Sequence, residues 1–144
     1  MMTPELREHN TPEKRFYATI HGWLKKAMLQ RIENTTSSGV PDVYVCLGER
    51  SVWLELKVGD SYTEVFLRKE QYAWGMRHAS FGGVTLVVAF LPPEDIVYWR
   101  YPFSVEKRGK YLVPHIRTMH LIPHDRESFL RAVYFEVYGK DHPW

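Results

Sequence analysis

Residues 39–57 read GVPDVYVCLGERSVWLELK, and the centre of the fold is predicted from them. Aliphatic side chains recur at every second position in both of its halves: Val43, Val45 and Leu47, then Val52, Leu54 and Leu56. Such alternation is typical of strands, and a turn at residues 48–51 separates the two halves. The stretch therefore predicts a hairpin of two short strands.

Three charged side chains are expected to meet at one end of this hairpin. Alternate residues of a strand share a face, so Glu55 and Lys57 point the same way. Asp42 follows Pro41 where the first strand begins, and pairing across the turn brings it close to the other two. Two carboxylates and an ammonium group are thus predicted to converge.

This set of groups suits the binding of a hard cation. Mg²⁺ takes oxygen ligands, usually one or two carboxylates together with water and substrate phosphate oxygens. Asp42 and Glu55 can supply the carboxylates, and the main-chain carbonyl of Leu56 can add a third oxygen. A bound cation lowers the pKa of its water and offsets charge on the attacked phosphate. Lys57 can orient that water or stabilise the developing negative charge.

The same residues resemble a known signature. The PD of residues 39–42 (GVPD) and the ELK of residues 55–57 resemble the PD-(D/E)XK nucleases. The lead-in GV and the later Gln71 resemble the VRR-NUC branch of that superfamily and the archaeal-type Holliday junction resolvases. The resemblance covers about residues 13–101. It implies an α/β fold with a restriction-endonuclease-like core, in which helices flank a mixed central sheet.

For function, the resemblance implies a stand-alone, phage-type endonuclease that hydrolyses DNA phosphodiester bonds. It implies Mg²⁺ as cofactor, with Mn²⁺ as a substitute, and structure-directed cutting of branched or flapped DNA, and it is compatible with a homodimer. One alternative is a non-catalytic DNA- or protein-binding module on the same fold, since fold does not fix function. The intact Asp42, Glu55 and Lys57 favour the enzyme. No feature of the sequence favours a third alternative, a phage structural or assembly protein.

Glu13 is a candidate for a further acidic group. Thr11 and Pro12 predict the start of a helix. An apolar stripe then follows at helical spacing: Phe16, Ile20, Trp23, Leu24, Ala27 and Met28. Glu13 precedes this stripe by one turn, and the resemblance implies a glutamate on the first helix near the metals. Two alternatives stay open: Glu13 complements the helix dipole, or Glu33 takes the acidic role.

Gln71 and several basic residues are the other candidates. The resemblance implies a glutamine after the ELK strand that hydrogen-bonds the scissile phosphate or a metal-bound water, whereas a lone helical glutamine is usually solvated. The small-residue loop 35–39, with Ser38 and Gly39, can admit a phosphate backbone or serve as a connector. Exposed cations of the predicted helix 67–81 can meet DNA phosphates or simply face solvent: Arg68, Lys69 and Arg77.

The rest of the chain completes an α/β pattern. Residues 31–34 predict a short strand or an approach to the site, and residues 83–90 and 95–101 predict two further strands. Because a helix links the second and third strands, those strands are expected to be parallel. Residues 103–123 are basic and aromatic, and Asp125 is expected to cap a last helix. We interpret this helix as closing the core, the alternatives being a dimer interface or a DNA wall.

Composition sets the outer limits. The chain has 144 residues, which predicts one domain over residues 1–144, with its core at about 11–101 and an extension at 102–144. A net charge of +2 excludes a global polycation, so a nucleic-acid surface must be local. The single cysteine excludes an internal disulfide and fits a reducing compartment, which predicts a cytoplasmic protein, in the host if phage-encoded. No apolar run approaches the roughly 20 residues that span a bilayer.

Overall fold

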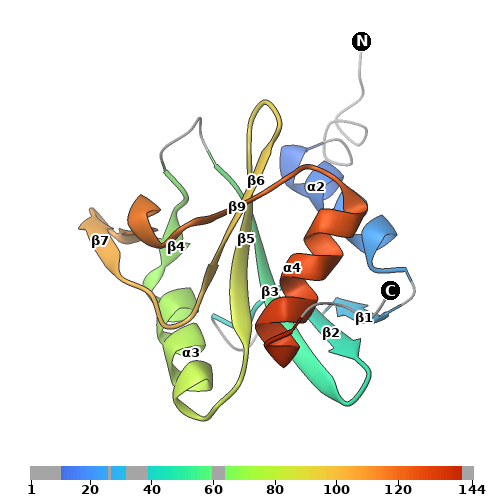
Figure 1. Ribbon diagram of the computed structural model, residues 1–144. Coiled ribbons are helices and arrows are strands. Elements are labelled where there is room, and N and C mark those ends of the chain that lie inside the picture. The colour runs from blue at the N-terminus through green and yellow to red at the C-terminus, as the bar shows by residue number, and fades with distance from the viewer. Residues whose placement is uncertain (1–10, 26, 32–38, 60–63, 141–144) are drawn as a thin grey trace.

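A six-stranded mixed sheet forms the centre of the computed structural model, which describes residues 11–25, 27–31, 39–59 and 64–140 (Figure 1). The first elements are α2 (Pro12–Trp23), β1 (Met28–Arg31), β2 (Val43–Leu47), β3 (Arg50–Val58), β4 (Leu67–Arg68) and α3 (Lys69–Ser80). The later ones are β5 (Thr85–Leu91), β6 (Asp95–Arg100), β7 (Val105–Arg108), β8 (Tyr111–Pro114), the short 3-10 helix η2 (Ile116–Thr118), β9 (His120–Ile122) and α4 (Arg126–Tyr138).

The sheet has the order β1-β2-β3-β5-β6-β9, and the predicted hairpin lies within it. β2 and β3 pair antiparallel from Val43↔Leu54 to Leu47↔Arg50, and Gly48 takes a positive φ of 76° in the tight turn between them. β3 and β5 are parallel, as expected for strands joined by the crossover through α3. The other neighbouring pairs in the sheet are antiparallel.

The two faces of the sheet are covered by different elements, as Figure 1 shows. On one face, apolar residues of α2 and α4 pack with Leu54 and Val88 in a common hydrophobic cluster. On the other face, α3 and the small sheet β4-β8-β7 cover Val87 and Ala89. Because β5 is covered on both sides, it is apolar at nearly every position. Glu55 pairs with Val87 across the parallel ladder and therefore faces α3.

One expectation about the N-terminal part is wrong in detail. Thr11 caps α2 as predicted, its side chain accepting from the Lys14 N–H at 3.2 Å, but the helix ends at Trp23 instead of continuing to Met28. Met28 begins β1 and pairs with Cys46, because the open edge of β2 offers backbone hydrogen bonds that outweigh the helical pattern. Of residues 31–34, expected to be a short strand or an approach to the site, Arg31 ends β1 and residues 32–34 fall outside the described part.

In the C-terminal part, the helix was the only element that the sequence predicted. Asp125 caps α4 by accepting from the Ser128 N–H at 2.8 Å, and Gly139 ends it with a φ of 70°. α4 buries Phe129 and Val133 in the core, which confirms that it closes the core. β7, β8 and β9 were not predicted: β9 extends the central sheet beside β6, and β8 pairs with β4. No helix in the described part of the chain is long and apolar enough to cross a membrane.

Candidate active site

The site begins where β3 extends past its neighbour. Pairing of β2 with β3 ends at Val43↔Leu54, whereas pairing of β3 with β5 continues to Val58. Asp42, just before β2, occupies the edge that β2 leaves open, and its Oδ2 accepts a hydrogen bond from the Leu56 N–H at 3.0 Å. The N–H and C=O of one strand residue point to the same side. The Leu56 carbonyl therefore points toward the edge that Asp42 occupies, as its predicted role as a ligand requires.

Gln71 joins Glu55 and Lys57 into one hydrogen-bonded group. Its Nε2 donates to Glu55 Oε1 at 2.6 Å, and its Oε1 accepts from Lys57 Nζ at 3.0 Å. The same Oε1 accepts from the Arg68 N–H at 2.9 Å, since Gln71 lies in the first turn of α3. Lys57 Nζ is 3.8 Å from Glu55 Oε1. Gln71 is buried, so its amide holds the lysine and the glutamate in a fixed relation.

Glu55 is electrostatically unusual. Burial, and next the nearby charge of Asp42, raise its pKa from 4.5 to about 8, against the opposing effect of Lys57. Glu55 Oε2 is buried and has no hydrogen-bond partner among the described residues. A buried carboxylate oxygen without a donor, next to a second carboxylate, is a place where a divalent cation would be bound favourably.

The donor set fits a magnesium-like ion better than a transition metal. The described residues contain no cluster of three or more His, Cys, Asp and Glu side chains. Two carboxylates and a main-chain carbonyl are instead the kind of partial set that Mg²⁺ completes with water and phosphate oxygens. Asp42, Glu55 and Leu56 thus fit the cation expected from the sequence.

The other predicted residues lie outside this group. Glu13 is in the first turn of α2, on the opposite face of the sheet from Glu55, and it is exposed. Phe16 and Ile20 define the buried side of α2, which leaves Glu13 on its exposed side, and the catalytic role of Glu13 stays a prediction. Glu33 and Ser38 fall outside the described residues. Three predicted DNA-contacting cations are exposed at or near α3: Arg68, Lys69 and Arg77.

Gly39 has a positional role that the sequence did not indicate. Its φ is 91°, and a Cβ there would lie 2.3 Å from the Glu70 main-chain oxygen. The backbone before Asp42 therefore packs directly against the first turn of α3, next to Gln71. Because Gly39 has no side chain, the segment before Asp42 can lie against the helix that carries Gln71. This holds whether or not a phosphate also approaches Gly39.

Gly39→Ala is expected to lower the free energy of unfolding by more than the roughly 1–3 kcal/mol of a strained φ, because the clash adds to the strain. Gly82→Ala is a matched control, since Gly82 has a φ of 86° and no heavy atom lies within 4 Å of the place that its Cβ would take. Urea denaturation of both variants separates the two contributions. Equal destabilisation would show that the contact with Glu70 is unimportant.

Tyr101 is a supporting residue that the sequence pattern did not indicate. Its buried hydroxyl donates to the Gln71 main-chain oxygen at 3.4 Å, and Gly75 leaves room for its ring. Burial, and next the charge of Glu55, raise the pKa of Tyr101. Tyr101 follows β6, 30 residues from Gln71 in the chain, so no local pattern could have indicated the contact.

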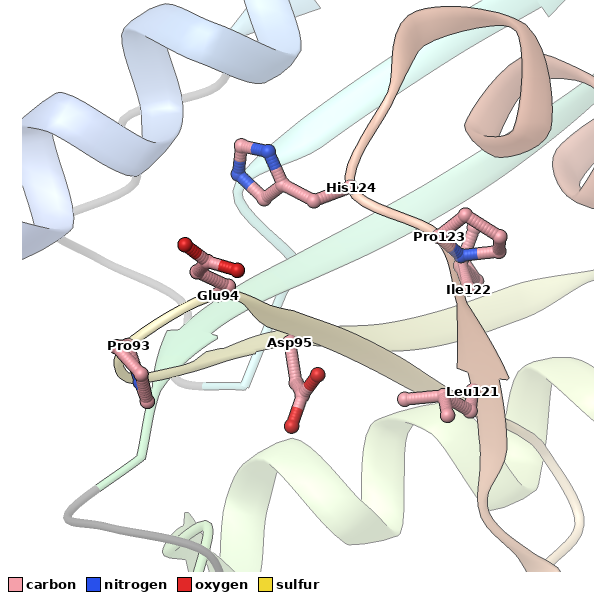
Figure 2. A pocket seen from close by; sticks show the side chains of 7 residues that line it. All are labelled: Pro93, Glu94, Asp95, Leu121, Ile122, Pro123 and His124. Carbon is pink, nitrogen blue, oxygen red and sulfur yellow. The ribbon is translucent and has the colours of Figure 1, made fainter.

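A surface pocket lies elsewhere and has the wrong chemistry for a phosphate. Figure 2 shows its lining side chains: Pro93, Glu94, Asp95, Leu121, Ile122, Pro123 and His124. Two of these are carboxylates, and none of the described lining residues is a lysine or arginine. The residues of the candidate active site do not contribute to it. Concave shape alone would therefore indicate a different site from the one that the buried polar groups indicate.

Comparison with solved structures finds a similar fold. One similar structure is that of Hjc, a Holliday junction resolvase from the archaeal hyperthermophile Archaeoglobus fulgidus, with a TM-score of 0.54 and 18% sequence identity. The match covers 69% of this chain and 84% of that one. The chain has a restriction-endonuclease-like fold. The predicted fold class is thereby confirmed, and so is the likeness in fold to archaeal resolvases. No protein-family model and no curated protein matches the sequence.

Proposed function

We propose that this protein is a metal-dependent nuclease that hydrolyses phosphodiester bonds of branched or flapped DNA. The observation that carries the proposal is the unsatisfied Oε2 of Glu55, buried beside Asp42 and within one hydrogen-bonded group with Lys57. Support for branched DNA comes from the fold shared with a Holliday junction resolvase. The narrower assignments of this protein, to the VRR-NUC branch and to a phage origin, are part of the same proposal. A homodimer is part of it too.

Each residue of the site has a distinct task in this proposal. Asp42, Glu55 and the Leu56 carbonyl would hold Mg²⁺, with Mn²⁺ as a substitute. When bound, the cation supplies an activated water and offsets negative charge on the phosphate. The Lys57 side chain is 22% exposed, against 6% for Glu55, so its ammonium group can reach a substrate while its partner stays buried. Gln71 positions that ammonium group by accepting its hydrogen bond.

DNA would be held mainly through its backbone. Arg68, Lys69 and Arg77 are exposed at or near α3, the helix that carries Gln71. Contacts of this kind position the nucleic acid without reading its sequence. We therefore propose that substrate choice depends on the shape of the DNA rather than on its bases.

The proposal predicts cation-dependent cleavage. Purified protein is incubated with linear, flapped, four-way and supercoiled DNA in Mg²⁺, Mn²⁺ or EDTA. We expect products from the branched or flapped substrates with either cation, and none in EDTA. Robust cleavage in EDTA would exclude the metal mechanism. Absence of cleavage with both cations on every substrate would instead favour the non-catalytic binding module.

A further inference from the structure

Four half-buried aromatic side chains form a continuous row beside the candidate active site. Tyr44 of β2 packs against Trp53 of β3 with ring centroids 5.0 Å apart, and Trp53 packs against Trp74 of α3 at 5.5 Å. Trp74 in turn contacts His78, one helical turn further, at 4.9 Å. We call Tyr44, Trp53, Trp74 and His78 the aromatic row.

The row does not belong to the hydrophobic core. None of its members is among the residues of the two apolar clusters that the described part of the chain forms on either side of the sheet. All four remain partly accessible, whereas the large side chains of the core, such as Phe129 and Leu54, are fully buried. Two tryptophans held together outside the core are poorly explained by stability alone, since partial burial recovers only part of the hydrophobic free energy.

The row continues the active site along the same two elements. Trp53 and Glu55 are alternate residues of β3 and share a face, so they lie about 7 Å apart along the strand. On α3, Trp74 follows Gln71 by about one turn, and these residues contact Trp53 and Glu55, respectively. Since stacked bases in DNA rise by about 3.4 Å, the row begins about two bases from the carboxylate.

The charge around the row is complementary to nucleic acid. Arg68, Lys69 and Arg77 are exposed at or near α3, against the single exposed acid of that helix, Glu70. Aromatic side chains beside a basic track are the combination that binds single-stranded nucleic acid, because each base offers a flat face for stacking. In a duplex these faces are already stacked on neighbouring bases.

We propose that the aromatic row stacks against the base of an unpaired nucleotide next to the scissile phosphate. This inference rests on the proposed nuclease function and adds the feature of DNA that the site selects: a splayed or single-stranded branch. A duplex without an unpaired base cannot use the row. The enzyme therefore distinguishes DNA with an unpaired base from a fully paired duplex by stacking. Contacts to phosphates alone would not give a preference for the unpaired form.

The test measures binding separately from cleavage. Fluorescence anisotropy in EDTA compares labelled oligothymidylate, a blunt duplex and a flapped duplex, so that no substrate is cut. Trp74→Leu is expected to weaken binding of the oligothymidylate and the flap about 5- to 150-fold, the range that loss of one base–aromatic stack produces. Binding of the blunt duplex should not change. Trp74→Phe, which keeps a ring, should restore most of the affinity.

A matched control is Trp23→Leu. Trp23 is also half-buried and packs against aromatic neighbours, but it lies on α2, beyond the opposite face of the sheet. The Trp23→Leu variant should bind all three DNAs with the affinity of the wild type. If Trp74→Leu does not fold, single-stranded DNA carrying 2-aminopurine gives a second measurement. Quenching of its fluorescence by the wild type, compared with quenching by Trp53→Phe and Trp74→Phe, reports whether the base stacks on the row.

The outcomes separate this inference from the proposed function. Equal affinity of wild type and Trp74→Leu for oligothymidylate, or an equal loss for duplex and single strand in a folded variant, would overturn the stacking surface even if the protein cuts DNA. Absence of quenching in the wild type would do the same, and would leave the row to a protein partner. Selective loss of single-strand binding supports the inference even if no cleavage is ever detected.

Discussion

Replacing Lys57 by alanine is expected to slow DNA cleavage about 10²- to 10³-fold, the effect of removing one donor that stabilises transition-state charge. The reason is that the Lys57 ammonium group donates to Gln71 at 3.0 Å and belongs to a side chain that is 22% exposed, so it can reach a phosphate in the proposed mechanism. An ammonium group cannot bind a cation, so the substitution should leave the metal site intact. Its effect should therefore appear in the rate at saturating DNA and metal, not in the concentration of metal that is required.

Asp42→Asn provides the contrasting variant. It removes a charged ligand, so we expect metal affinity and cleavage to fall together, with activity restored only in part by high Mn²⁺. Lys107→Ala controls for the general loss of a positive charge, because Lys107 is exposed on β7 and lies in neither the site nor the proposed DNA contacts. Cleavage by Lys57→Ala at the wild-type rate would reduce Lys57 to a surface lysine.

Glu55→Gln is expected to abolish cleavage and yet to stabilise the metal-free protein at alkaline pH. Burial, and next the charge of Asp42, raise the pKa of Glu55 from 4.5 to about 8. A carboxyl group with a raised pKa in the folded state favours folding while it is protonated. This contribution is fully present below about pH 4.5 and is lost as the pH rises through about 8. The loss should amount to a few kcal/mol, on the order of 1.4 kcal/mol for each unit of pKa.

Glutamine keeps the shape of Glu55 and its hydrogen bond from Gln71 but has no charge to bury. Thermal unfolding in EDTA from pH 5 to pH 9 should therefore show a decline for the wild type that is absent from Glu55→Gln. Glu49→Gln, in the exposed turn after β2, is the matched control and should decline like the wild type. Adding Mn²⁺ should stabilise the wild type most at high pH. The same decline in the wild type and in Glu55→Gln would show that ionising Glu55 in the folded protein costs little free energy.

The parts of the fold that were predictable depend on local patterns. Alternation along residues 43–56 predicts β2 and β3, and a helix between β3 and β5 requires those strands to be parallel. Convergence of Asp42 with Glu55 follows from the same pairing. β7, β8 and β9 are three or four residues long and have little alternation, and they form by pairing with strands distant in sequence.

The site shows the same limit. Gln71 could be identified from the resemblance, but its bridge between Lys57 and Glu55 depends on how α3 packs on the sheet. Glu13 belongs to the first turn of a helix whose buried side is set by Phe16, and its exposure could not be inferred from spacing alone. Contacts that cross between elements are decided by tertiary packing, which a single sequence does not display.

The most direct test of this account is a calorimetric titration of the metal-free protein with Mn²⁺ at pH 8. We expect one saturable site in the wild type and in Lys57→Ala, and no comparable binding in Asp42→Asn or Glu55→Gln. Manganese is a suitable probe because it accepts the same carboxylate, carbonyl and water ligands as magnesium. Equal binding by the wild type and both carboxylate variants would contradict the account, because the cation would then be held by other residues.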